Sequence, residues 1–228
     1  MALGLIALVS IVALAYLPGL WVKGVLVRHA VERTDFPGTG GELARHLLDE
    51  MKLNHIKVEE TDRGDHYDPI EKVVRLSPGH FNKKSLSAVV VAAHEVGHAM
   101  QDATGYAPLK ARTKLAKQAQ KVEILGSIVM LLSPLMLVLM KAPAAMLVEL
   151  FFGLLILSFG VLMHAVTLPV EFDASFRRAL PVLVAGKYVA DKDMDSARQI
   201  LRAAAFTYVA SAAMSLLNVA RWLRVLRI

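Results

Sequence analysis

The sequence contains no cysteine among its 228 residues. This absence excludes a framework of disulfide bonds, a thiolate metal ligand and a cysteine nucleophile. A metal ion bound by this chain must therefore be held by histidine, aspartate or glutamate side chains. The sequence also lacks internal repeats and low-complexity segments, so a repeat array is not expected.

Polar residues are scarce for a chain of this length. Hydrophobic residues make up 55% of the sequence and the mean hydropathy is +0.48, which favours a membrane protein over an ordinary soluble domain. The 26 basic and 20 acidic residues give a net charge of +6, and the basic residues gather beside apolar runs, at 28–33, 110–121 and 221–227. Charges placed there suit lipid headgroups, so we expect a lipid bilayer as a partner and no nucleic acid.

Four apolar runs divide the chain. We predict a mainly α membrane protein with three to four transmembrane helices, because about 20 apolar residues cross a bilayer. The predicted segments are an N-terminal transmembrane helix at 1–22, a soluble domain at 23–121, a transmembrane helical hairpin at 122–168, a helix and charged loop at 169–202, and a C-terminal helix at 203–228. The first run lacks the cationic start of a cleaved signal peptide, which favours a retained anchor. The C-terminal helix, rich in Ala and Ser, either spans the membrane or lies at its interface.

The soluble domain has a mixed pattern of helices and strands. Leucines at helical spacing predict an amphipathic helix at 41–52, and short extended segments predict strands at 56–60 and 72–76. The second strand either presents an exposed edge for an extended peptide or is an ordinary strand of a sheet. Ser85 is a suitable N-cap for a helix that extends to about residue 102. We therefore expect a small α+β domain that ends in a very apolar helix.

This last predicted helix contains the sequence HEVGH. Positions four apart lie on one face of a helix, so His94 and His98 can direct their imidazole nitrogens at one point. Imidazole suits Zn²⁺, and a catalytic zinc site takes three protein ligands and leaves the fourth position for water. Glu95 is the candidate general base, and Gly97 allows a backbone or a substrate to approach closely. The alternative is a buried helix in which both histidines are satisfied by hydrogen bonds.

A third ligand must lie on the same side of the predicted membrane as His94. Two apolar runs separate His98 from Glu171, so the chain returns to the face of the soluble domain at Glu171. Glu149 lies at the opposite end of the third run and fails this test. Pro169 is expected to end the membrane helix, with a new helix starting near Glu171. Glu171 is therefore the candidate third ligand.

Several segments resemble, in the same order over nearly the whole chain, the YugP-like family of bacterial membrane neutral zinc metallopeptidases: DHYDPIEKVVRLSPGHFN, HEVGHAMQ, GYAPL and LPVEFDASFRRAL. The resemblance implies a zincin-like, gluzincin-type soluble domain with one catalytic zinc ion. It also implies that His94, His98 and Glu171 bind this zinc and that Glu95 is the catalytic base. The plan is similar to that of the HtpX and CAAX-protease group, where an Asp commonly lies four residues after the ligand Glu and supports a ligand histidine; this sequence has Ser175 there.

The sequence thus predicts a membrane-embedded zinc metalloprotease, an endopeptidase acting on protein or peptide substrates. The cations near the apolar runs predict a multi-pass protein of the bacterial plasma membrane with its catalytic face in the cytoplasm. The alternative is a zinc-binding scaffold or chaperone that does not cleave. The presence of Glu95 argues against this alternative, because holding zinc requires no carboxylate at this position. Candidates for stabilising an oxyanion are Tyr106, Arg177, Arg178 and Tyr208.

Overall fold

The structure is a computed structural model that describes residues 2–139 and 142–206, with some side chains of its three longest helices outside the description. Its elements are α1 (Ala2–Arg28), α2 (Gly40–Glu50), β1 (Lys57–Glu60), β2 (His66–Asp68), β3 (Val73–Leu76), α3 (Pro78–Phe81), α4 (Leu86–Ala103), α5 (Ala107–Leu139), α6 (Ala142–Phe172), the π-helical segment η1 (Asp173–Ala179), α7 (Leu180–Ala185) and the 3-10 turn η2 (Asp191–Asp193). The predicted helix at 203–228 lies largely outside the described residues.

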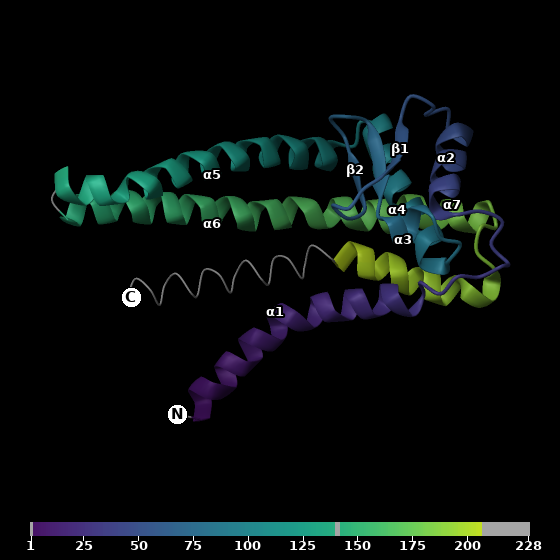
Figure 1. Ribbon diagram of the computed structural model, residues 1–228, viewed down its shortest axis with the longest axis horizontal. Coiled ribbons are helices and arrows are strands. Elements are labelled where there is room, and N and C mark those ends of the chain that lie inside the picture. Colours follow the sequence, from purple (N-terminus) through teal and green to yellow (C-terminus); the bar gives the residue numbers. More distant parts are fainter. Residues whose placement is uncertain (1, 140–141, 207–228) are drawn as a thin grey trace.

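Figure 1 shows two parts that differ in shape. The compact part consists of α2, the sheet, α3, α4, the last turn of α6 with Glu171, η1 and α7. The hairpin consists of α5 and the rest of α6, which lie side by side and project from the compact part. The metal-binding motif lies in the compact part, on α4.

A capping box starts α2. The Thr39 side chain accepts a hydrogen bond from the Glu42 backbone N–H, and the Glu42 side chain accepts one from the Thr39 backbone N–H. This reciprocal pair satisfies backbone donors that the first turn leaves free. The helix buries Leu47 and Leu48 and packs against α4. The predicted amphipathic helix is confirmed.

The sheet has the strand order β1-β3-β2, with β1 parallel and β2 antiparallel to β3. Both predicted strands are confirmed, and β2 is a third strand that the sequence did not predict. Because β3 is central, the alternative in which it presents an exposed edge is wrong. Its residues Val73, Val74 and Leu76 are buried, and the strand contacts α4.

The helix α4 is the centre of the compact part and contacts α2, α3, the sheet, η1 and α7. Its N-cap is Ser85, whose Oγ accepts a hydrogen bond from the Ala88 backbone N–H at 3.2 Å, as the sequence predicted. Almost every residue of α4 is buried. The helix therefore carries its polar side chains into the interior, where each needs a partner.

The chain does not start a new helix after Pro169. Helix α6 continues through this proline to Phe172 and then passes into η1, so the predicted break is wrong. In η1 the backbone bonds reach five residues back, as from the Leu180 N–H to the Ser175 carbonyl, and such wide turns often occur at functional sites. Just before η1, the Val170 carbonyl accepts a hydrogen bond from the Gln101 side chain of α4.

Among the residues that the structure describes, no helix is both long enough and apolar enough to cross a membrane. The prediction of three to four transmembrane helices is therefore wrong, and so is the multi-pass location in the bacterial plasma membrane with a cytoplasmic catalytic face. The lipid bilayer as a partner has no support either. One reason for the wrong prediction is the composition of α5. The predicted apolar run and the charged turns before it form one continuous helix, whose charged residues include Lys110, Lys114, Lys121 and Glu123.

Candidate metal centre

His94, His98 and Glu171 lie together inside the compact part. Glu171 Oε2 is 3.2 Å from His94 Nε2 and 3.3 Å from His98 Nε2, and the three candidate ligand atoms lie within 4.8 Å of one another. Zinc–nitrogen bonds of about 2.0–2.1 Å at tetrahedral angles place neighbouring ligand atoms about 3.3 Å apart. The two distances to Glu171 match this spacing, so the three side chains form a candidate site for a tetrahedral zinc ion.

The geometry of α4 directs both imidazoles to one point. The ring centroids of His94 and His98 are 4.8 Å apart and the ring planes are nearly perpendicular, at 81°. Between them, Gly97 lets η1 approach, because a Cβ at this position would lie 2.7 Å from the Ala174 carbonyl oxygen. The predicted close approach is thus made by the backbone that follows Glu171.

Ser175 orients the imidazole of His94. Its Oγ donates a hydrogen bond to the Leu201 carbonyl at 3.1 Å and lies 3.0 Å from His94 Nδ1. A hydroxyl whose proton goes to a carbonyl must accept at its oxygen, so the Nδ1–H of His94 donates to it. The Nε2 atom that faces Glu171 then carries a lone pair. Ser175 therefore gives His94, a candidate ligand, a hydrogen-bond acceptor at Nδ1.

Gln101 orients the imidazole of His98 in the same way. Its Nε2 donates to the Val170 carbonyl at 2.7 Å and to Asp173 Oδ2 at 2.9 Å, and its Oε1 lies 3.0 Å from His98 Nδ1. Burial alone would raise the pKa of Asp173, but hydrogen bonds from Arg178 and Gln101 lower it below its usual value. Asp173 is thus an anionic acceptor that fixes the amide, and the amide fixes the ring.

Glu171 supplies the carboxylate of the candidate site. Burial alone would raise its pKa, whereas His98 and His94 rings protonated on both nitrogens would lower it well below its usual range. Its second oxygen, Oε1, accepts a hydrogen bond from Arg112 Nη1 at 3.0 Å. A carboxylate and two imidazoles form a donor set that Zn²⁺ prefers.

Glu95 follows His94 on α4 and is buried. Burial raises the pKa of Glu95 to about 7; the His94 imidazole opposes this rise, and the charges of Glu171 and Asp65 add to it. A carboxyl group with such a pKa can both accept and release a proton at neutral pH. Its position next to the candidate ligand set is suitable for a general base.

The structure separates the residues that the sequence offered for oxyanion stabilisation. Arg178 is bound to Asp173 and its guanidinium lies over the Tyr106 ring, 5.5 Å from the centroid, while Arg177 is exposed. Tyr208 lies outside the described residues.

The sequence reasoning missed Arg112 and Gln101. Gln101 could have been found, because it lies three residues after His98 and hence on the same face of the helix.

The fold and the site define a class of protein in which a helix with two histidines and a later glutamate together form a candidate zinc site. The chain belongs to the family described as "Putative neutral zinc metallopeptidase", whose profile matches residues 4–227. It is 37% identical over 196 residues to a Bacillus subtilis (strain 168) protein called "Putative membrane protease YugP", covering 82% of this chain and 80% of the relative. No solved structure gives a significant match. The YugP-like resemblance and zinc as the cofactor are thereby confirmed.

Proposed function

We propose that the chain is a zinc-dependent endopeptidase in which His94, His98 and Glu171 hold one zinc ion and Glu95 is the general base. The observation that carries this proposal is the convergence of two imidazole nitrogens on one carboxylate oxygen at 3.2 and 3.3 Å, next to a buried glutamate. Membership of a metallopeptidase family supports a protein or peptide as the substrate.

Bound zinc polarises a carbonyl oxygen and lowers the pKa of a water molecule. Glu95 takes a proton from the attacking water and later delivers it to the leaving amine. Ser175 and Gln101 accept the Nδ1 protons of the two histidines, which keeps both Nε2 lone pairs directed at the same point. The burial of these groups strengthens their mutual electrostatic effects, because little water screens them.

The test compares the wild-type chain with Glu95→Gln, which keeps the shape of the side chain but cannot take up the proton. We expect one zinc per chain in both proteins, and casein cleavage at least about 100-fold slower in the variant. Zinc is measured by atomic emission, and cleavage by the release of soluble peptides. Glu123→Gln, at an exposed position of α5, is the matched control and should cleave like the wild type. Equal cleavage by the Glu95 variant would refute the role of this residue.

A second measurement tests the endopeptidase assignment. A peptide blocked at both ends has no free terminus for an exopeptidase to recognise, so its cleavage by the wild type and not by Glu95→Gln supports internal cleavage. Cleavage that requires a free terminus would show an exopeptidase instead. Chelation of zinc should stop either reaction, and activity that survives complete removal of zinc would contradict the mechanism.

A further inference from the structure

The two carboxylate oxygens of Glu171 have different partners. Oε2 faces the Nε2 atoms of both histidines, whereas Oε1 accepts a hydrogen bond from Arg112 Nη1 at 3.0 Å. The side chain of Glu171 is 2% exposed and that of Arg112 is 22% exposed. In such a partly buried ion pair, geometry matters more than at the surface, because loss of one partner leaves the other charge poorly solvated.

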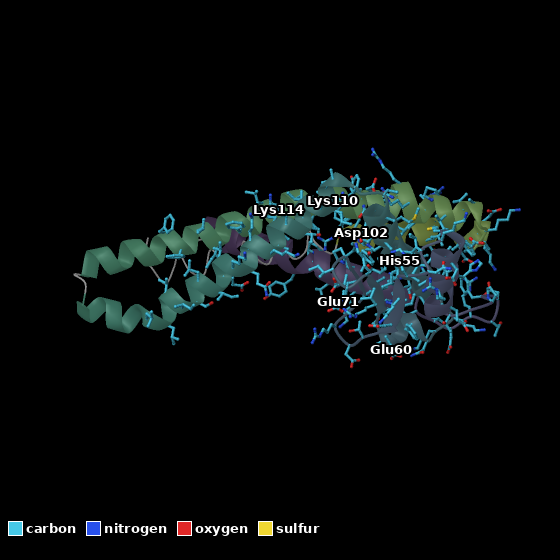
Figure 2. All side chains as sticks on the ribbon, turned by 90° about the horizontal axis from the view of Figure 1, so that it is seen from above. His55, Glu60, Glu71, Asp102, Lys110 and Lys114 are labelled. Carbon is cyan, nitrogen blue, oxygen red and sulfur yellow. The ribbon has the colours of Figure 1, made fainter. Side chains whose placement is uncertain are left out.

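Arg112 faces a different direction from the basic residues on either side of it. Figure 2 shows Lys110 and Lys114 along α5, where this helix leaves the compact part, and both are exposed. Residues two apart on a helix point to different faces. The turn that presents two lysines to solvent therefore directs Arg112 toward the metal centre.

The pairing also connects the two helices of the hairpin. Arg112 lies near the beginning of α5, and Glu171 lies in the last turn of α6, 59 residues later. The side-by-side packing of these helices brings the guanidinium to the oxygen of Glu171 that does not face the histidines. Arg112 therefore acts on the candidate metal site through Glu171.

A carboxylate can coordinate a metal through one oxygen or through both. If both oxygens of Glu171 were bound, the second would occupy the position that a catalytic zinc site leaves for water. A guanidinium is charged at every working pH and directs its N–H groups at a carboxylate oxygen with fixed geometry. We propose that Arg112 is a positioning residue that holds Oε1 away from the metal, so that Glu171 binds zinc through Oε2 alone. This inference rests on the proposed function of the site.

The test uses the full-length chain loaded with cobalt(II) in place of zinc. Four-coordinate cobalt(II) absorbs visible light more strongly than five-coordinate cobalt(II), so the absorption reports coordination without any substrate. For Arg112→Gln we expect one cobalt per chain, a clear loss of visible absorption per bound cobalt, and a kcat of the zinc form about 10- to 100-fold lower. Lys114→Gln removes a positive charge from the exposed face of the same helix and should leave the spectrum and kcat unchanged.

Arg112→Lys keeps the charge but loses the planar fork, and we expect a spectrum between those of the wild type and Arg112→Gln. This conservative variant also replaces Arg112→Gln if the latter does not fold. A wild-type spectrum in both Arg112 variants would overturn the inference. A folded Arg112→Gln protein that binds no cobalt would overturn it too, because Arg112 would then be needed to form the site and not to set its coordination.

X-ray absorption of the wild-type zinc protein gives an independent answer, because it distinguishes one bound carboxylate oxygen from two. Two bound oxygens from Glu171 would overturn the inference even in an active enzyme. A wild-type chain that binds no zinc and cleaves no peptide would instead contradict the proposed function. An active wild type whose Arg112 variants behave identically would contradict only the role of Arg112.

Discussion

The compact part and the hairpin differ in which side chains they bury. In the compact part, Gln101 and Glu171 are 0% and 1% exposed. On the hairpin, Leu131 and Phe151 are 79% and 60% exposed. The buried polar groups of the metal centre are bound to one another, which offsets the cost of removing them from water. The burial of a polar side chain in this molecule therefore depends on the partners that it finds.

The same substitution should accordingly have different consequences in the two parts. A residue of the compact part is held by several elements at once, whereas the described residues of the hairpin contact mainly the other hairpin helix. Matched pairs of substitutions, one in each part, test whether the effects on stability and zinc binding differ between the two parts.

The largest difference is expected for leucine. Leu48 on α2 is fully buried in the core, so Leu48→Ala should lower the free energy of unfolding by about 2–5 kcal/mol through lost burial and a cavity. Leu131→Ala on α5 should change it by less than about 0.5 kcal/mol. Urea unfolding followed by circular dichroism measures both. Equal losses would show that Leu131 is packed in solution and would remove the contrast.

The second pair is glutamine. Gln101→Leu removes the hydrogen bonds to His98, Val170 and Asp173. We expect a loss of about 1–3 kcal/mol in unfolding free energy, because buried partners lose their hydrogen bonds, and zinc binding about 10- to 100-fold weaker. Gln120→Leu, at an exposed position of α5, should leave zinc affinity unchanged. Competition with a chromophoric chelator gives both affinities, and wild-type zinc affinity in Gln101→Leu would mean that the amide does not orient the imidazole.

The third pair replaces glycine by alanine, and the change in the free energy of unfolding should have opposite signs in the two parts. Gly97→Ala forces a methyl group against the Ala174 carbonyl, 2.7 Å away, and should destabilise the chain by about 1–3 kcal/mol. Gly153→Ala on α6 meets nothing within 4 Å and should stabilise the helix by up to about 1 kcal/mol. The shift in Tm measured by calorimetry reports both signs. A stabilising Gly97→Ala would show that α4 and η1 are farther apart than the structure has them.

The sequence predicted local features that depend on few residues. The Ser85 cap, the helix with the two histidines and two of the three strands follow from spacing and composition, and the structure has all of them. It also indicated that Glu171 meets the histidines, and the three side chains are together. Their roles as metal ligands stay a prediction, which the zinc measurements above test.

Features that depend on packing could not be predicted in this way. Nothing in the residues around Arg112 distinguishes it from the neighbouring lysines, because its role depends on how α5 lies against α6. Pro169 was expected to break a helix, but the chain continues into η1. The prediction of transmembrane helices is wrong in part because α5 contains charged and apolar turns in one helix. The hydrogen bond between Ser175 and His94 likewise depends on the packing of η1 against α4, so the spacing of residues does not predict it.

The π-helical segment η1 has a consequence for how the chain tolerates insertion and deletion. A wide turn of this kind corresponds to an α-helix with one residue added, and here it lies between the end of α6, which contains Glu171, and α7. Deleting a single exposed residue such as Arg177 would return the segment to regular α-helical geometry. Because the wide turn takes up the added residue locally, the side chains on either side of it would keep nearly their present orientation, whereas the same deletion in a regular α-helix would rotate everything beyond it by about 100°. The wide turn thus lets this part of the chain lose one residue while the candidate metal centre and α7 stay in register.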